Sequence, residues 1–321
     1  MAKGQSSIGI LLMAFGGPNS EEEVEPFIHR VLGREVPARR VRETKRRYRL
    51  IGGRSPLLEI TRRQARGLEK ILNARHPRFK VYVGMRYWHP FIAETLGEII
   101  RDRIRRVVAL SLTPHQSKMS TEPYVLALQR AMTIAKGELE VSVVKGWHTH
   151  PLFLRALAEK LQEGLLQFPR GVRGRVPIIF SAHSLPKRAI VGDPYVEQIE
   201  ATIRGVIELT GPFPWRLAFQ SRGAKGGEWL DPEVRTVLQE LMGEGHREVL
   251  MAPVGFVSDN VETLYDIDIF YRQQAGSMGI SFRRSPSLND SSTFIEALSH
   301  IVREHLGDTI WNAHGEVEVE N

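Results

Sequence analysis

The chain has 321 residues, 42% of them hydrophobic and 25% charged, so it is long enough for about two globular domains, and collagen-like, low-complexity and disordered classes are excluded. It contains no cysteine, which excludes a disulfide framework, a thiolate nucleophile and a cysteine-held zinc or iron–sulfur centre. The formal net charge of +7 favours anionic partners: nucleic acid, an acidic membrane surface or a polycarboxylate ligand.

No segment is predicted to cross a membrane or to direct the chain through one. The longest apolar run, residues 8–15, is well below the roughly 20 residues that span a bilayer. It runs into Gly16-Gly17-Pro18 without the small-residue cleavage site of a signal peptide. We therefore expect a cytoplasmic protein.

Short apolar segments, predicted as buried strands, alternate along the chain with amphipathic segments predicted as helices. The predicted strands cover residues 8–15, 79–83, 106–112, 139–144, 176–181, 215–220 and 248–253. The predicted helices begin after the capping residues 19–20 and then cover 91–104, 194–209, 232–244, 262–274 and 294–306. This alternation is typical of right-handed βαβ units and parallel sheets.

The two halves of the chain resemble each other in layout. Each opens with an apolar strand that runs into a turn with proline, at Pro18 and Pro186, and each later has a strand that meets proline, at Pro114 and Pro253. We therefore predict an α/β fold of two similar doubly wound, Rossmann-like parallel-sheet domains, 1–145 and 146–321. In such folds the ligand lies at the carboxyl ends of the strands, so the active site is expected in the cleft between the domains.

Two residues just after predicted strands of the second half have chemistry suited to a metal or a proton. His183 follows the strand 176–181, and Glu262 follows the strand 248–253 with Asp266 one helical turn further on. Each has a structural alternative: a hydrogen-bonded histidine at a strand end, or a helix-capping Asp259–Glu262 box. A neutral histidine and a carboxylate suit a divalent metal, proton removal or both, and without a zinc-type ligand cluster the metal would be held loosely and passed on.

Two further segments leave alternatives open. His148 and His150 flank Thr149 and could bind a metal, or simply form a loop near the domain boundary. Nine arginines lie between residues 30 and 54, at 30, 34, 39, 40, 42, 46, 47, 49 and 54. They suit a solvated helix face, a carboxylate or phosphate clamp, or a membrane-surface patch. No P-loop or Gly-x-Gly-x-x-Gly motif supports the use of a nucleotide.

At these same positions the sequence resembles the ferrochelatase family, enzymes that insert ferrous iron into a porphyrin. The matching segments run in family order over nearly the whole chain, at 12–18, 48–57, 84–90, 181–186, 192–195, 220–221, 229–230 and 253–266. The Ser-Ala-His-Ser-Leu-Pro segment together with the Ser-Asp-x-x-Glu-Thr-Leu-Tyr segment is a highly specific pair. The resemblance outweighs the structural alternatives for His183 and Glu262.

The resemblance implies a role for each matching residue. His183 and Glu262 match the catalytic histidine and its carboxylate partner, on opposite sides of the cleft and facing the porphyrin centre. Asp266 falls on the acidic track that leads metal toward the surface, so His183, Glu262 and Asp266 are the expected metal-handling residues. The positions expected to line the porphyrin pocket are Phe15, Arg47, Tyr48, Ser55 and Tyr124.

The sequence departs from parts of the family pattern. Phe15 stands where some relatives have a tyrosine that ligates product iron, and Phe270 replaces an acid of the outer metal track. No cysteine-bearing extension is present, so no iron–sulfur cluster is expected, and Fe²⁺ is a substrate. The segment 27–36 is short, as in enzymes that use tetracarboxylate porphyrins, while Phe15 favours the other type; protoporphyrin IX and coproporphyrin III both stay open.

Alternative functions are a chelatase for another tetrapyrrole or metal, and a non-catalytic porphyrin or haem carrier. The presence of both His183 and Glu262 argues against each. A nucleic-acid binder would need a basic motif interleaved with aromatic residues, and none is present. Beyond the porphyrin, weak electrostatic contact with a membrane and transient contacts with neighbouring haem-pathway enzymes are the partners left open.

Overall fold

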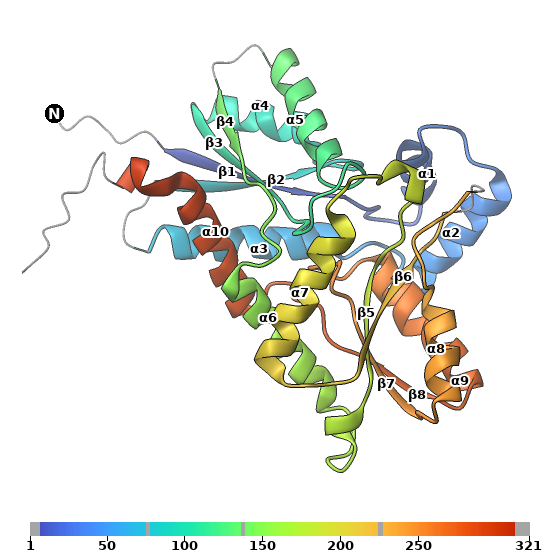
Figure 1. Cartoon of the computed structure of the whole chain (residues 1–321). Helices are drawn as coiled ribbons and strands as arrows, with labels where there is room; N and C mark the ends of the chain where they lie inside the picture. The colour runs from blue at the N-terminus through green and yellow to red at the C-terminus, as the bar shows by residue number, and fades with distance from the viewer. Residues whose placement is uncertain (1–6, 75–77, 136–138, 224–226, 312–321) are drawn as a thin grey trace, which may run out of the picture.

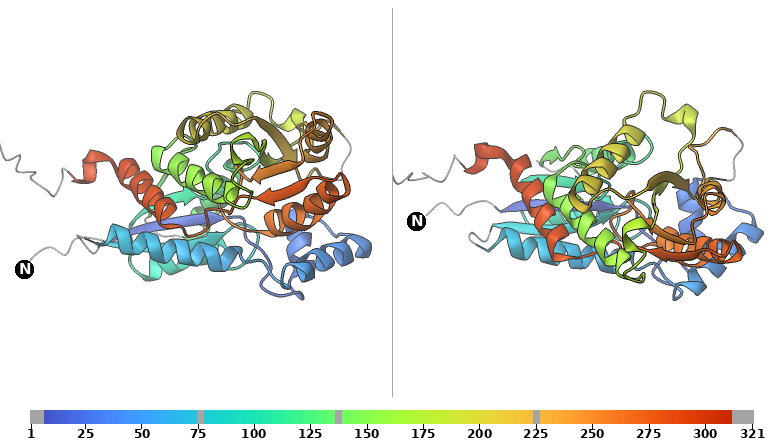
Figure 2. Two further views of the ribbon diagram at one scale, coloured as in Figure 1. Left: turned by 90° about the horizontal axis from the view of Figure 1, so that it is seen from below. Right: turned by 60° about the horizontal axis from the view of Figure 1, so that its bottom comes forward.

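The computed structural model describes residues 7–74, 78–135, 139–223 and 227–311, and in these residues two parallel four-stranded sheets are covered by helices (Figure 1, Figure 2). The first sheet has the strand order β2-β1-β3-β4 and the second the order β6-β5-β7-β8. The first strand of each half is therefore an inner strand, flanked by the second and third. The predicted α/β class with two similar doubly wound sheets is confirmed.

The strands of the first sheet are β1 (Ile8–Ala14), β2 (Phe79–Met85), β3 (Arg106–Ser111) and β4 (Glu140–Val143). Those of the second are β5 (Ile178–His183), β6 (Trp215–Gln220), β7 (Glu248–Ala252) and β8 (Ser281–Arg284). The helices of the first half are α1 (Val24–Leu32), α2 (Ala38–Leu50), α3 (Leu57–Leu72), α4 (Ile92–Arg101) and α5 (Glu122–Ile134). The remaining helices are α6 (Pro151–Leu165), α7 (Tyr195–Thr210), α8 (Val234–Gly243), the π-helix η3 (Glu262–Tyr271), α9 (Arg272–Ser277) and α10 (Ser292–Trp311), with short 3₁₀ turns η1 (Arg173–Arg175) and η2 (Lys187–Ala189).

The inner strands are apolar because both of their faces are covered. Every residue of β1 is buried, and its first residue, Ile8, lies opposite both Phe79 of β2 and Arg106 of β3. In β5 all residues except His183 are buried. A strand buried on both faces has no polar alternation and appears in the sequence as a continuous apolar run, so β1 and β5 were predicted near their true positions.

The last helix of the chain joins the two halves. Helix α10 packs against α3 of the first half and against α6, which follows the first sheet (Figure 1). Trp147 and Phe294 contribute to this core, and both of their rings contact Phe153, which is fully buried. The strands 8–143 and 178–284 fall on either side of the predicted division at residue 145, which itself stays a prediction.

Several helices and one strand were not predicted. Helix α2 carries mainly arginine and charged residues, and just two of its residues, Val41 and Tyr48, are buried. Strand β8 is short and its sequence is Ser-Phe-Arg-Arg, which gives no apolar run. It becomes a strand because its backbone pairs with β7, from Glu248↔Ser281 to Met251↔Arg284. Pairing partners far away in sequence supply that stabilisation, so local pattern does not reveal it.

Candidate active site

His183 and Glu262 are in direct contact at the carboxyl edge of the second sheet. His183 is the last residue of β5, and Glu262 is the first residue of η3, which follows β7. The imidazole Nδ1 of His183 lies 2.9 Å from the Glu262 carboxylate Oε2. Both side chains are partly exposed, with 39% and 26% of their surface accessible, so the pair can be reached by a ligand.

The backbone around this pair is tightly packed. The amide of Gly255 donates a hydrogen bond to the carbonyl of Ser181, at 3.1 Å. A Cβ at residue 255 would lie 3.0 Å from the backbone of Ala182, so glycine allows this approach. On β5 itself, the Tyr195 hydroxyl donates to the His183 carbonyl at 3.1 Å. These contacts hold the strand end at a fixed position beneath the imidazole.

Contact between His183 and Glu262 corrects one expectation. The residues were expected on opposite sides of a cleft, but the carboxyl ends of β5 and β7 meet at the same sheet edge and bring them together. Burial alone would lower the pKa of His183, but the charge and hydrogen bond of Glu262 outweigh burial and raise it. Burial likewise opposes ionisation of Glu262, yet His183 lowers the pKa of that carboxyl overall, so each group favours the charged form of the other.

Asp266 lies further along the same π-helix and is a different kind of carboxylate. It is 8% exposed, accepts a hydrogen bond from Ser221 Oγ at 2.8 Å, and has the Arg47 guanidinium 3.5 Å away. Burial, and then the charge of Glu262, raise the pKa of Asp266 to about 6. Because this pKa lies near neutrality, Asp266 can gain or lose a proton under ordinary conditions. Asp268 points elsewhere, toward Arg284.

Sequence reasoning gave no role to several residues that surround the pair. Ser221 hydrogen-bonds Asp266 and its hydroxyl also lowers the pKa of Glu262. Gln220 lies opposite His183 in the β5–β6 register, is 1% exposed, and has its Oε1 without a hydrogen-bond partner. The signal was present in the sequence, because 192–195 and 220–221 were among the matching segments. The contacts of residues 192–195 and 220–221 with β5 could not be assigned from the sequence, because β6 and α7 meet β5 only in the folded chain.

The residues expected to line the porphyrin pocket differ in accessibility. Phe15, just after β1, is 42% exposed, and the Arg47 side chain on α2 is 50% exposed. Tyr48 and Tyr124 are each 3% exposed and Ser55 is 7% exposed. Glu262 contributes to the raised pKa of Tyr48, after burial, so that phenol lies near the His183–Glu262 pair. Tyr124 instead belongs to the core of the first half, under the guanidinium of Arg86.

No preformed multidentate metal site accompanies this arrangement. Within the described ranges, no three or more histidine or acidic side chains converge closely enough to hold an ion. The alternative at His148 and His150 gains no support, since His150 instead lies 3.5 Å from Glu304 and His148 is partly buried beside His115. A metal ion bound beside His183 and Glu262 would need its remaining ligands from another molecule.

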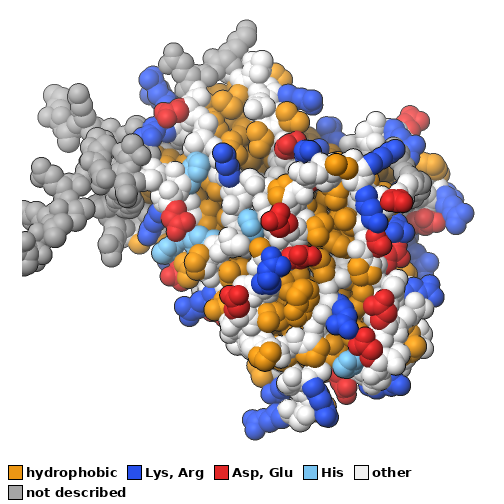
Figure 3. Space-filling model, in the orientation of Figure 1, with side chains coloured by type: hydrophobic (Ala, Val, Ile, Leu, Met, Phe, Trp, Pro, Cys, Tyr) orange, Lys and Arg blue, Asp and Glu red, His pale blue; other side chains and the backbone are white. Residues whose placement is uncertain are grey.

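The surface on the side of α2 carries acidic as well as basic side chains (Figure 3). Three of the basic residues there are paired: Arg39 with Glu43, Lys45 with Glu25, and Arg49 with Glu21. None of the helices in the part of the chain that the structure describes is both long enough and apolar enough to cross a membrane. Residues 38–50 of the arginine-rich segment form a largely solvated helix, with Arg47 turned toward Asp266, and the clamp and membrane-patch alternatives stay predictions.

The fold is that of the chelatases. SirB from Bacillus subtilis with Fe3+ matches with a TM-score of 0.59 and 11% identity, over 95% of this chain and 98% of that one. The sirohydrochlorin chelatase SirB from Bacillus subtilis subspecies spizizenii in complex with cobalt matches with a TM-score of 0.55 and 11% identity, over 95% and 97%. At this identity the likeness concerns the fold.

Sequence comparison is more specific. The family model Ferrochelatase matches residues 7–306. A ferrochelatase of Geotalea daltonii is 41% identical over 318 residues, covering 93% of this chain and 98% of the relative, and one of Geotalea uraniireducens is 42% identical over 314 residues, covering 92% and 97%. The chain therefore belongs to the ferrochelatase family. It is a metal-insertion enzyme of the lyase class, and membership implies iron as the substrate metal and a porphyrin as the other substrate.

Proposed function

We propose that this protein inserts Fe²⁺ into protoporphyrin IX or coproporphyrin III, in a late step of haem biosynthesis, and that His183 and Glu262 act at the macrocycle centre. The observation that carries the proposal is the His183–Glu262 pair, 2.9 Å apart at the carboxyl edge of the second sheet. Arg47 and Tyr48 from α2 of the first half approach the same place. A ligand seated there would meet residues of both halves.

The reaction requires the site to handle two protons and one metal ion. A free porphyrin has two pyrrole N–H groups, and Fe²⁺ replaces both protons, so the total charge balances. The ionised Glu262 carboxylate can attract Fe²⁺ or accept a proton. Glu262 stabilises a proton on the His183 imidazole. Once that proton has left, His183 can accept a proton from a pyrrole. An approaching cation favours that loss, because it competes with the imidazolium for the carboxylate.

Asp266 extends this pair toward Arg47. The raised pKa of Asp266 lets this residue carry a proton away from Glu262. Its carboxylate is also a third group for metal handling, beside His183 and Glu262. We assign His183, Glu262 and Asp266 to metal handling on this basis. Which of His183 and Glu262 takes the protons first is left to the kinetics of single variants.

The macrocycle is assigned to the first half. Phe15 offers an exposed ring for packing, and Arg47 offers a guanidinium for a propionate. Tyr48, Ser55 and Tyr124 are nearly buried, so they shape the pocket wall from beneath unless the halves shift when the porphyrin binds. Binding energy spent on propionates and ring faces can distort the planar macrocycle and expose its nitrogen lone pairs.

Anaerobic absorbance assays test the proposal directly. Purified protein is mixed with Fe²⁺ and either protoporphyrin IX or coproporphyrin III, and loss of the free-porphyrin bands with growth of the haem bands is followed. We expect catalytic turnover with at least one of the two porphyrins. Stoichiometric porphyrin binding without turnover of either would favour the carrier function, and turnover with cobalt and sirohydrochlorin in place of both would favour a different chelatase.

A further inference from the structure

A buried arginine lies behind the active site, on the side away from the His183–Glu262 contact. Arg284 is the last residue of β8, and its side chain is 11% exposed. Its Nε and Nη2 donate to the two carboxylate oxygens of Asp268 at 2.9 and 2.8 Å. Its Nη1 donates to Asp259 Oδ1 and to Ser287 Oγ, both at 3.1 Å. One guanidinium thus connects two carboxylates.

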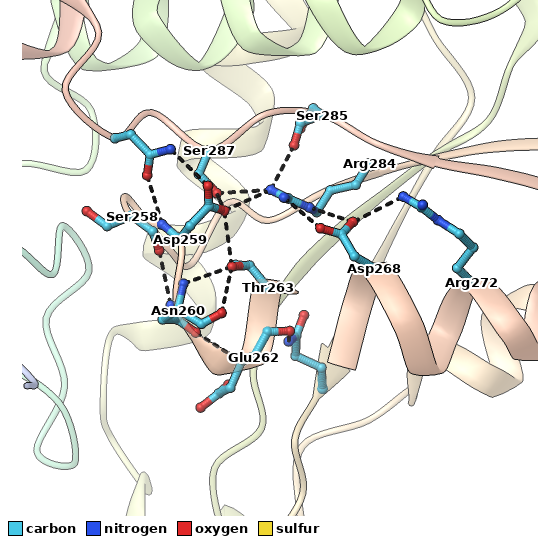
Figure 4. A network of polar contacts seen from close by, with 12 residues as sticks. Ser258, Asp259, Asn260, Glu262, Thr263, Asp268, Arg272, Arg284, Ser285 and Ser287 are labelled. Atoms are coloured by element: carbon cyan, nitrogen blue, oxygen red, sulfur yellow. Dashed lines mark hydrogen bonds and ion pairs between the residues drawn. The ribbon is translucent and has the colours of Figure 1, made fainter. Parts of the chain in front are cut away.

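The two carboxylates lie on either side of Glu262 in the chain. Asp259 belongs to the loop that leads from β7 into η3, whereas Asp268 lies within η3 itself. Arg284 therefore fixes the π-helix at its entry and again along its length. Figure 4 shows Glu262 extending away from the guanidinium, so the active-site carboxylate lies outside this network while its backbone lies inside it.

The loop is also fixed by neutral side chains. Asp259 accepts hydrogen bonds from Ser287 at 2.7 Å, Thr263 at 3.1 Å and Asn289 at 2.9 Å. Asn260 Oδ1 accepts from the Glu262 amide at 2.8 Å. The backbone that carries the Glu262 side chain is thus held on both sides of its Cα. We call these residues, together with Arg284 and Asp268, the Arg284 network.

Burying a charged side chain such as that of Arg284 costs free energy. A buried ion pair contributes little net stability compared with apolar residues of the same volume, because both charges lose their hydration. What an arginine fork adds is geometry, since its donors have fixed directions that match a carboxylate. A shift of about 1 Å in a reacting group can cost about 100-fold in rate, so directional fixing matters most beside a site of chemistry.

We propose that Arg284 is a positioning residue, which sets the Glu262 carboxylate against His183 by fixing the Asp259 loop and the π-helix together. The inference rests on the proposed function of the His183–Glu262 pair. Arg284 touches neither porphyrin nor iron in this arrangement. Its loss should therefore slow metal insertion and leave porphyrin binding unchanged.

The test compares Arg284→Met, Asp259→Asn and the double variant with wild type, with kcat expressed per porphyrin-binding site titrated by fluorescence quenching. We expect each single variant to lower kcat by about 10- to 100-fold at an unchanged porphyrin KM, as is usual when residues that orient metal-handling groups are lost. Because both belong to one hydrogen-bonded network, the double variant should lose less than the two single losses combined. Arg284→Lys, which keeps the charge but not the fork, should recover part of the rate, and it replaces Arg284→Met if that variant does not fold.

Arg272→Met is the matched control. Arg272 also contacts Asp268, at 3.2 Å, but from the outer side, where its side chain is 50% exposed. We expect its kcat to stay within roughly threefold of wild type. The positioning role is overturned if kcat per site in the Arg284 and Asp259 variants also stays within roughly threefold of wild type. It is also overturned if porphyrin KM changes as much as kcat does, or if the kcat losses of the two single variants are additive in the double variant. Wild-type protein without iron insertion would overturn both this inference and the proposed function, whereas an active wild type with an unaffected Arg284→Met would overturn the positioning role alone.

Discussion

Removal of the His183 imidazole should abolish most of the chemistry and little of the binding. His183→Ala is expected to lower the rate of iron insertion by about 10²–10⁴-fold, the usual contribution of a proton-transferring group, while porphyrin still binds to the first half. Initial rates by absorbance and porphyrin affinity by fluorescence measure the two effects separately. His246→Ala, at a histidine that precedes β7 and lies 3.6 Å from Glu244, is the control. Retention of more than roughly a tenth of the wild-type rate would contradict the assignment.

Phe15 is expected to leave the product iron without a tyrosine ligand. A phenyl ring has a π-face and no lone pair, so product haem should lack the charge-transfer absorption of an iron–tyrosinate bond. Phe15→Tyr should introduce that absorption and slow product release, because the new bond stabilises the product. Resonance Raman spectra of the ferric complexes provide the measurement. An iron–phenolate stretch in the wild type would contradict this placement, and Tyr87, whose ring lies 4.6 Å from that of Phe15, would be the first residue to replace.

Asp266 should make the folded state less stable as the pH rises. Burial, and then Glu262, raise the pKa of Asp266 from 3.8 to about 6. The folded protein therefore holds a proton that the unfolded chain has released, and wild-type stability falls as the pH rises from about 4 to about 6. Asp266→Asn removes this cost and should raise the free energy of unfolding at about pH 8 by up to about 3 kcal/mol, with no gain near pH 4.

Urea unfolding at about pH 4.5 and pH 8 measures that difference. Asp102→Asn is a control of opposite sign. The hydrogen bond from Lys80, and then that from Tyr82, lower the pKa of Asp102, so its ionised form stabilises the fold and the variant should lose stability at the higher pH. A difference between wild type and Asp266→Asn that does not change with pH would contradict the raised pKa of Asp266.

At the residue scale, the sequence predicted identities better than contacts. His183 and Glu262 could be found because each follows an apolar strand and each lies in a distinctive matching segment. Their contact could not be found, because the path of the chain from β7 to Glu262 depends on Asp259, Arg284 and Asn289. The raised pKa of His183 also depends on that contact, so it could not be predicted from the sequence either.

Helix α2 should attach the protein to anionic membranes weakly and in a salt-sensitive way. Its exposed Arg42 and Arg46 are surface charges, and each basic residue near an anionic surface contributes about 1 kcal/mol. Arg42→Gln/Arg46→Gln should therefore reduce co-sedimentation with phosphatidylserine vesicles at low salt by about tenfold or more. Arg235→Gln/Arg247→Gln removes the same charge from exposed positions of the second half and is the control. Equal losses in both variants, or binding that survives about 0.5 M salt, would contradict attachment through α2.

At the scale of elements, strands were predicted better than helices: all seven predicted strands form, including the partly exposed β4, whereas α2, α3, α5 and α6 were not predicted. Strands β1, β5, β6 and β7 were located to within a few residues because their sequences are apolar and end at turns. Helix α2 has a polar sequence, and a solvated helix face was one of three alternatives that its arginines left open. The helical segment predicted as 262–274 forms, but its first part is the π-helix η3, and the sequence pattern does not distinguish i→i+4 from i→i+5 pairing.

At the scale of the whole molecule, a buried glutamine joins the halves directly behind the site. Gln64 on α3 is fully buried, and its Nε2 donates to Ser258 Oγ at 2.9 Å and to the Asn289 carbonyl at 2.6 Å. Ser258 precedes Asp259, and Asn289 binds Asp259, so the first half is attached to the same loop that Arg284 fixes from the second. The attachment of the halves therefore includes a polar contact that the amphipathic pattern of α3 does not reveal, since Gln64 occupies a buried position of that helix.

Gln64→Leu should therefore weaken both the fold and the attachment of the halves. The substitution leaves Ser258 Oγ and the Asn289 carbonyl without this donor inside the protein, at a cost of about 1–3 kcal/mol in the free energy of unfolding. Its neighbour Arg63 also bridges the halves, to Asp290 at 3.0 Å, but through partly exposed side chains. Arg63→Leu should cost less than about 1 kcal/mol, because exposed ion pairs contribute little. Urea unfolding and iron-insertion rates of both variants test the difference. Equal stabilities of the two variants would contradict a buried attachment through Gln64. A destabilised Gln64→Leu variant with an unchanged insertion rate would show that the second half holds the Glu262 loop in place by itself.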